Sequence, residues 1–172
     1  MSVVVPAPAK INLQLSVGPL RDDGYHELVS VFQAVSLVDV VTAQRGEGVQ
    51  VSMSGEGSES LATDDSNLVV QAIHALAQHA QIDPHVSIHV EKSIPLAGGM
   101  AGGSADAAGT LVACDALWGT GLSREELADI GACLGSDVPF ALFGSNAIGR
   151  GRGEEIMTVL GRGQFHWGFA LA

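Results

Sequence analysis

The 172-residue chain is 47% hydrophobic and 16% charged, so it holds enough apolar surface for one folded domain and is not disordered throughout. Its net charge of −11, from 8 basic and 19 acidic residues, disfavours binding to nucleic-acid phosphates or anionic membranes. It lacks a secretion signal, and Cys114 and Cys133 are too few for a disulfide framework or a four-cysteine zinc site, so we expect a soluble protein of the reduced cytoplasm.

The first predicted elements are strands. Apolar and polar residues alternate over residues 3–17, which predicts a strand that buries one face, made of Ile11, Leu13, Leu15 and Val17. After a turn over residues 21–24, residues 28–43 are rich in valine and phenylalanine. They predict one bent strand, or two strands with a break near Ser36.

The next segment predicts a strand, a helix and a strand. Residues 49–53 alternate in the manner of a short strand, and a polar loop follows over residues 55–65. Asp65 or Ser66 can cap a helix that runs to about residue 80. Alternation returns over residues 86–90 and predicts another strand.

The second half of the chain is mainly helical. A glycine-rich stretch over residues 94–103 precedes a predicted alanine-rich helix from residue 104 to about 117. Ser123 and Glu126 have capping-box spacing at the start of a helix to about residue 134. A hairpin or turn is expected over residues 147–153 and a strand over 165–172. Strands come first and no strict strand–helix repetition follows, which favours a mixed α+β domain.

The glycine-rich stretch is the strongest candidate for a binding site. Small residues let a ligand approach the backbone, successive N–H groups can form an anion-binding hollow, and the following helix N-terminus favours phosphate. Ser104 can cap that helix or offer its hydroxyl to a phosphate or a metal. The spacing matches neither the Walker A loop nor the dinucleotide fingerprint. The alternative is a flexible surface loop before a core helix.

Three further positions carry chemistry, each with a plain structural alternative. Lys10 shares a strand face with Asn12 and can hold a phosphate or lower the pKa of a carboxylate, or it can simply be solvated. Asp137 can accept a proton from a substrate hydroxyl, or it can cap a short helix with Pro139 in its first turn. Tyr25, the only tyrosine, can stack on a base or flank a turn.

Four stretches together resemble the GHMP kinase superfamily, and within it the kinases that act on 4-diphosphocytidyl-2-C-methyl-D-erythritol. The stretches are Pro-Ala-Lys-Ile-Asn-Leu at 8–13, Asp-Gly-Tyr-His at 23–26, the loop at 95–108, and Leu-Gly-Ser-Asp-Val-Pro-Phe at 134–140. The loop indicates only the superfamily, whereas the first two stretches point to the narrower group. Three loop positions, where members of this group often have glycine or serine, are alanine in this chain: Ala97, Ala101 and Ala105. The side chains stay small, but a hydroxyl is lost at Ala105.

This resemblance implies an α+β fold similar to domain 2 of ribosomal protein S5, with a left-handed βαβ unit. It implies transfer of the γ-phosphate of ATP, with Mg²⁺, to the 2-hydroxyl of the cytidine diphosphate-linked methylerythritol, a small-molecule substrate of isoprenoid precursor biosynthesis. The alternatives are another kinase of the superfamily, similar to mevalonate or homoserine kinase, or a non-catalytic nucleotide-binding module. Because the chain stops within an apolar run, we expect residues 1–172 to be the N-terminal ATP-binding domain, truncated at or before the C-terminal one. The sequence predicts no oligomeric state.

The resemblance also implies a role for each candidate residue. Asp137 is the expected base and Lys10 its partner, while Asn12, Tyr25 and His26 bind the substrate. Ser104 is the expected contact to Mg²⁺. The expected ATP-binding residues are Asn67, Lys92, Pro95, Leu96, Ala97, Gly98, Gly99, Met100, Ala101, Gly102, Gly103, Ser104 and Ala105.

Overall fold

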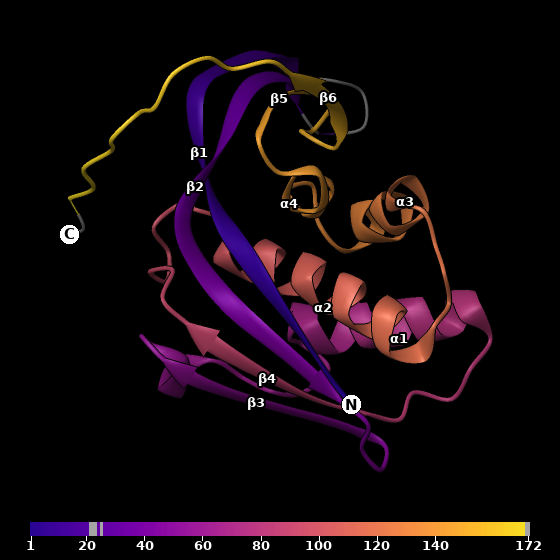
Figure 1. Ribbon diagram of the computed structural model, residues 1–172. Helices are drawn as coiled ribbons and strands as arrows, with labels where there is room; N and C mark the ends of the chain where they lie inside the picture. Colours follow the sequence, from indigo (N-terminus) through magenta and orange to yellow (C-terminus); the bar gives the residue numbers. More distant parts are fainter. Residues whose placement is uncertain (21–23, 25, 171–172) are drawn as a thin grey trace.

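The computed structural model describes residues 1–20, 24 and 26–170, which fold into one six-stranded sheet with helices packed on one side (Figure 1). The strands are β1 (Ser2–Leu20), β2 (His26–Gln44), β3 (Val49–Gly55), β4 (Val86–Lys92), β5 (Asn146–Arg150) and β6 (Glu155–Val159). Their order is β3-β4-β2-β5-β6, and β1 pairs with β2. Strand pairing is antiparallel except between β3 and β4, which are parallel and joined through helix α1 (Leu68–Ala80) as a βαβ unit. The α+β class predicted from the sequence is confirmed.

Strand β2 is the central element of the sheet, and it is one continuous strand. It pairs with β5 over residues 30–33 and with β4 over residues 40–44, while β1 runs along almost its whole length. The alternative of two strands with a break near Ser36 is therefore wrong. This single curved strand runs from one end of the domain to the other and connects the parts of the sheet at both ends (Figure 1).

The buried face predicted for the first strand is wrong. Leu13, Leu15 and Val17 are 44%, 55% and 59% exposed. The register of β1 shifts between Pro8 and Lys10, and again between Asn12 and Gln14, so simple alternation does not hold across it. The buried part of β1 comes earlier, at Ala7 and Ala9. Residues 12–17 are exposed on both faces, so no described helix covers this end of the strand.

The helices follow the predicted positions, with differences at their ends. Helix α1 begins after Asn67, whose side chain accepts a hydrogen bond from the Val69 N–H. The cap therefore lies one residue beyond Ser66 and two beyond Asp65, the two predicted positions. Helix α3 (Arg124–Leu134) has the predicted capping box of Ser123 and Glu126. A short 3-10 helix over Ser58–Ser60 lies in the predicted loop.

Two predictions near the chain's end have different outcomes. Strands β5 and β6 form the hairpin expected over residues 147–153. The strand expected over 165–172 is absent from residues 165–170, and residues 171–172 lie outside the described part of the chain. Residues 163–170 run along the molecule as an extended segment without a strand partner (Figure 1), where Trp167 Nε1 donates to the Gln33 side chain at 2.8 Å.

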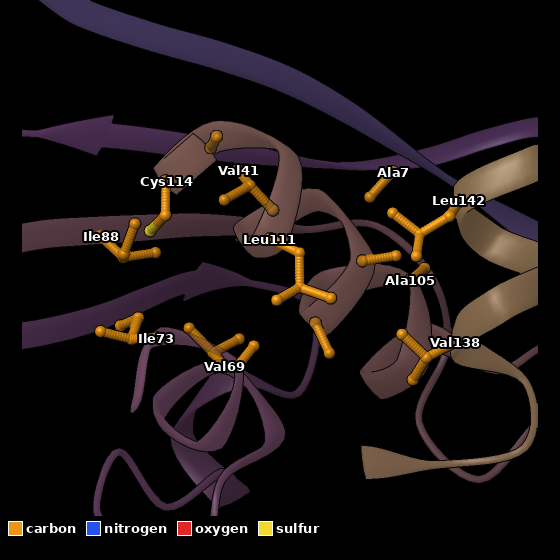
Figure 2. Packing of buried hydrophobic residues seen from close by; sticks show 14 of the residues in the cluster. Ala7, Val41, Val69, Ile73, Ile88, Ala105, Leu111, Cys114, Val138 and Leu142 are labelled. Carbon is orange, nitrogen blue, oxygen red and sulfur yellow. The ribbon is translucent and has the colours of Figure 1, made fainter. Parts of the chain in front are cut away.

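Helix α2 (Gly102–Trp118) lies at the centre of the core, which explains its small side chains. Figure 2 shows Leu111 and Ala105 of α2 among side chains from α1, the sheet and α4 (Val138–Phe143). At Gly109 a β-carbon would lie 2.9 Å from the Val41 side chain, so the close approach of helix and sheet requires glycine. Cys114 is buried, and its burial raises the pKa of the thiol. None of the described helices is long and apolar enough to cross a membrane.

Candidate functional site

Lys10 and Asp137, 127 positions apart in the sequence, meet at the junction of β1 and α4. Lys10 Nζ lies 3.5 Å from Asp137 Oδ2, and the two side chains are 11% and 30% exposed. Asp137 occupies the N-cap position of α4, but its carboxylate makes no capping hydrogen bond. The carboxylate is therefore not committed to the helix, and it remains open to solvent and to a ligand beside the ammonium group.

A short network orients Lys10. Its Nζ donates to Asn12 Oδ1 at 2.8 Å, and Asn12 Nδ2 donates to Ser30 Oγ on the neighbouring strand at 2.6 Å. Ser30 in turn donates to the carbonyl of Gln14 at 2.9 Å. The ammonium also lies 5.2 Å from the centre of the Phe32 ring, within the range of a cation–π contact. These contacts fix the ammonium near Asp137 while leaving part of both groups accessible.

The glycine-rich loop adjoins this pair through the backbone. The Lys10 N–H donates to the Met100 carbonyl at 3.1 Å, so the strand that carries the lysine also holds the loop. Ala97, Gly99 and Ala101 all adopt left-handed backbone conformations, with φ of 58°, 67° and 58°. Glycine adopts this region freely, whereas alanine does so only at a cost in free energy. Two of these three left-handed positions are therefore occupied by a residue type that disfavours that conformation.

Helix α2 starts at the end of this loop and faces the segment before α4. Its N-cap residue is Ala101, so the prediction that Ser104 caps the helix is wrong. Ser104 lies in the first turn instead, and its Oγ is 3.9 Å from where a β-carbon would lie on Gly135. Figure 2 shows Val138 and Leu142 of α4 pointing toward Ala105 of α2. This packing brings the helix N-terminus and the Asp137 segment to the same place.

A buried charged cluster lies beneath the loop. Lys92 Nζ donates to Asp39 Oδ2 and to Asp106 Oδ2, each at 2.5 Å, and all three residues are at most 3% exposed. Burial raises the pKa of the Asp106 carboxyl to about 7 despite the opposing effect of Lys92. Lys92 and Asp106 also line a pocket of about 230 Å³, together with Asn67, Gly103 and apolar side chains that include Met53 and Leu68.

A second and larger hollow is lined in part by Gly135 and Ser136, the two residues before Asp137. Its volume is about 740 Å³, and it is lined by Val17, His26, Leu28, Ala132, Cys133, Leu134, Gly135, Ser136 and Arg152. His26 Nδ1 lies 2.8 Å from the Gly18 carbonyl, which can only accept, so Nδ1 carries a proton. In the neutral ring, Nε2 is then a hydrogen-bond acceptor.

Comparison with known proteins identifies the fold and the kinases that this chain resembles. Residues 67–145 match the model of the GHMP kinases N terminal domain. A crystal structure of 4-(cytidine 5'-diphospho)-2C-methyl-D-erythritol kinase superimposes with a TM-score of 0.77 at 35% identity, over 91% of this chain and 55% of that one. The fold of this chain is that of the N-terminal domain of GHMP kinases. A mevalonate kinase from Methanococcus jannaschii has the same fold, with a TM-score of 0.68 at 14% identity over 94% of this chain and 56% of that one.

The sequence relatives of this GHMP kinase domain are closer still. The 4-diphosphocytidyl-2-C-methyl-D-erythritol kinase of Salinispora arenicola is 60% identical over 98% of this chain and 54% of its own length. The enzymes of the same name from Mycolicibacterium smegmatis and Mycobacterium tuberculosis are 56% and 54% identical over 99% of this chain. The chain spans about half the length of these relatives. The resemblance predicted from the four sequence stretches is confirmed.

The geometry brings most of the predicted site residues of the GHMP kinase domain together. Lys10, Asn12 and Asp137 form one cluster, and the loop from Pro95 to Ala105 adjoins it through Met100. Asn67 lines the smaller pocket, where its side chain also caps α1. Tyr25 lies outside the described residues, so its stacking on a base stays a prediction. The binding and catalytic roles of all these residues stay predictions as well.

Three polar residues of the site escaped the sequence analysis. Ser30 looks like an ordinary polar residue of a strand, and Asp39 like a charge on an alternating strand. Their roles come from partners 16 and 53 positions away, which no local pattern encodes. Asp106 had a visible signal, because it is the only charged residue within the glycine- and alanine-rich run over residues 97–109. A lone charge in a core helix calls for a buried partner.

Proposed function

We propose that this domain is the N-terminal, ATP-binding part of a kinase that phosphorylates the 2-hydroxyl of 4-diphosphocytidyl-2-C-methyl-D-erythritol. The observation that carries the proposal is the Lys10–Asp137 pair, 3.5 Å apart and tied to the glycine-rich loop by the Lys10–Met100 backbone hydrogen bond. A carboxylate to accept the proton, a cation to offset charge and backbone N–H groups to bind the phosphates are what phosphoryl transfer to an alcohol requires. The 54–60% identity to kinases of that name supports this substrate over others.

Asp137 acts as the base in the proposed reaction. Its carboxylate accepts the proton of the 2-hydroxyl as that oxygen forms a bond to the γ-phosphorus, and the bond from the γ-phosphorus to the bridging oxygen of ADP breaks. Lys10 offsets the negative charge that gathers near the attacking oxygen. Asn12 and Ser30 hold the ammonium in place, since they fix its direction through hydrogen bonds of 2.8 and 2.6 Å.

The glycine-rich loop and the start of α2 bind the phosphates of ATP in this proposal. The backbone N–H groups from Gly98 to Gly103 and the positive end of a 17-residue helix favour an anion. The 230 Å³ pocket lies directly beside Gly103 and is lined by Asn67 and apolar side chains, which suits a nucleotide base.

Mg²⁺ fits this arrangement as a partner of the nucleotide rather than of a protein cage. The described residues hold no group of three or more His, Cys, Asp or Glu side chains that could bind a metal. Ser104 Oγ, in the first turn of α2, is the protein oxygen that we expect to contact a phosphate-bound ion. When bound, Mg²⁺ neutralises charge on the transferred phosphoryl group.

The 740 Å³ hollow takes the cytidine end of the substrate. In the neutral ring, His26 Nε2 is a hydrogen-bond acceptor, which complements the exocyclic amino group of cytosine, a donor. The predicted partner is thus a small molecule. A mevalonate or homoserine kinase has the same fold but is only 13–20% identical, so this likeness supports the fold alone.

The direct test is turnover by the intact protein with ATP, Mg²⁺ and each candidate alcohol. We expect ADP release and a new phosphate monoester with 4-diphosphocytidyl-methylerythritol, and none with mevalonate or homoserine. Turnover with another alcohol would assign a different kinase of the superfamily. ATP binding without turnover on any alcohol would make the domain a nucleotide-binding module.

A further inference from the structure

The glycine-rich loop has a conformation that its own sequence disfavours. Ala97 and Ala101 both lie in the left-handed region, at φ 58°. Strained backbone of this kind persists only where surrounding contacts enforce it. The Lys10–Met100 hydrogen bond holds the loop near its C-terminal end. A second contact is needed at the N-terminal end of the loop, which follows β4.

Asp39 holds that end. Its Oδ1 accepts hydrogen bonds from the backbone N–H groups of Ser93 and Ile94, at 2.5 and 2.8 Å. These are the first residues after β4, immediately before Pro95. Asp39 is 0% exposed and lies in the middle of β2, so a rigid element supplies the contact. Hydrogen bonds from N–H groups to a buried carboxylate are among the stronger ones in proteins.

Lys92 connects this end of the loop to the helix on the other side. Its Nζ donates to Asp39 Oδ2 and to Asp106 Oδ2, and Asp106 lies four residues into α2. Gly102 sits between them, where a β-carbon would be 3.5 Å from Lys92 Nζ. The strand before the loop and the helix after it are therefore joined by one ammonium group.

Burial of these three charged side chains costs free energy, which argues against a role in stability alone. Asp106 Oδ1 is buried without a hydrogen-bond partner among the described residues, and two carboxylates share one cation. Burial of such groups is often less favourable than burial of apolar side chains of similar volume. A fixed geometry for the loop is what these three charges supply and apolar residues would not.

We propose that the buried triad of Asp39, Lys92 and Asp106 is a clamp that holds the glycine-rich loop in its binding conformation. The three residues are positioning residues, because they act on a nucleotide through the loop backbone. The effect on ATP rests on the proposed function, whereas the effect on loop motion does not. If the loop samples its binding conformation only part of the time, apparent affinity falls in proportion.

Hydrogen exchange of the ligand-free intact protein tests the clamp without any turnover. Asp39→Ala removes the acceptor for Ser93 and Ile94, and Asp106→Leu removes the link to α2. In both variants we expect the amides of residues 93–101 to exchange at least tenfold faster. Asp106→Asn keeps an oxygen that can accept from Lys92, so its effect should be clearly smaller. If Asp106→Leu does not fold, Asp106→Ser takes its place, because serine is small and polar.

A matched control separates the clamp from general destabilisation. Asp115 lies on the same helix, but its Oδ1 accepts from Thr120 and Leu122 at the far end. Asp115→Leu should lower stability without faster exchange in the loop. In kinetics, Asp39→Ala and Asp106→Leu should raise the KM for ATP about tenfold and leave the KM for the alcohol unchanged.

The outcomes are distinguishable. Faster loop exchange in a protein that does not phosphorylate any alcohol would leave the clamp standing and overturn the proposed function. Folded Asp39→Ala and Asp106→Leu variants with wild-type loop exchange would overturn the clamp, whatever the activity. Equal acceleration in Asp115→Leu would also overturn it, because the effect would then be one of stability.

Discussion

Single side chains decide what chemistry this domain can perform, and Asp137 is the clearest case. It stands where a capping residue stands, yet its carboxylate faces Lys10 at 3.5 Å and makes no cap. The bond that a capping aspartate would make to a backbone N–H is absent, so the carboxylate keeps its ability to accept a proton. A positional pattern alone leaves these two roles indistinguishable, because both use the same residue before the same short helix.

Asp137→Asn is expected to lower kcat by roughly a factor of 10² to 10⁴ in the intact protein, because the amide keeps the shape but cannot accept the proton. KM values for both substrates should change little. Steady-state kinetics with the diphosphocytidyl substrate measure both. Asp129→Asn, an exposed change on α3, is the matched control. Wild-type turnover in the Asp137 variant would reduce that residue to a structural position.

Asp106 gives the domain a specific dependence on pH. Its pKa in the folded state is about 7, above the ordinary value of 3.8, because burial disfavours the charged form. Between pH 4 and pH 7 the folded protein therefore holds a proton that the unfolded chain has released, so this carboxyl's contribution to stability falls as pH rises. Above pH 7 the loss is complete.

Denaturant unfolding of wild type and Asp106→Asn at several pH values checks this. The free energy of unfolding of the variant, relative to wild type, should rise with pH between 4 and 7 and then level off, by on the order of 4 kcal/mol. Subtraction removes the other titrating groups that the two proteins share. If the difference between variant and wild type does not change with pH, the pKa of Asp106 in the folded protein is not raised.

At the scale of elements, the loop and helix α2 form the proposed phosphate-binding unit, and its glycines are not equivalent. A β-carbon on Gly102 would lie 3.2 Å from Ile94 and 3.5 Å from Lys92 Nζ, so a larger residue there would press on the buried triad. On Gly103 the nearest atom would be Leu68 Cδ1 at 3.7 Å, an ordinary contact. Gly103 also lines the 230 Å³ pocket.

Gly103→Val should therefore be the cleaner test of ATP binding. We expect the variant to fold and its affinity for ATP to fall at least tenfold, because a branched side chain blocks the approach of phosphate to the backbone. Gly102→Val should lose ATP binding too, with some loss of stability. Gly168→Val, where a β-carbon meets nothing within 4 Å, is the control. Calorimetry that finds unchanged affinity in folded Gly103→Val would contradict a phosphate site here.

At the scale of the whole molecule, one end of the sheet carries apolar side chains in solvent. Leu15, Val17 and Leu20 are 55%, 59% and 65% exposed along β1. The larger hollow includes Val17, so this apolar surface continues toward the proposed substrate pocket. Contiguous apolar surface of this kind promotes association in water.

Because of this exposed apolar surface, we expect the 172-residue chain produced by itself to self-associate. We also expect it to have weak or no kinase activity. The double variant Leu15→Lys with Val17→Lys should sediment as a smaller species, because charge on an exposed strand face opposes association. Gln14→Lys with Ser16→Lys adds the same charge on the neighbouring positions and serves as the control. Equal sedimentation of wild type and the leucine–valine variant would place the association elsewhere, and a monomer with full activity would refute both expectations.

Local features of this domain are predictable from short stretches of its sequence. The capping box of Ser123 and Glu126, the β5–β6 hairpin and the α+β class all follow from residues close together in the chain. The glycine-rich loop was visible because its small residues are contiguous. The family followed from four short stretches whose order and spacing are one-dimensional properties.

Only the tertiary structure decided which face of β1 is buried and which charges meet. Leu13 has the alternation of a buried residue, but register shifts and the lack of a covering helix leave it exposed. Lys92 is expected from the sequence to contact ATP, yet its ammonium is buried and donates to Asp39 of β2 and Asp106 of α2. The physical reason is the same in both cases: burial and pairing depend on elements that are distant in sequence, and periodicity describes only an element's own faces.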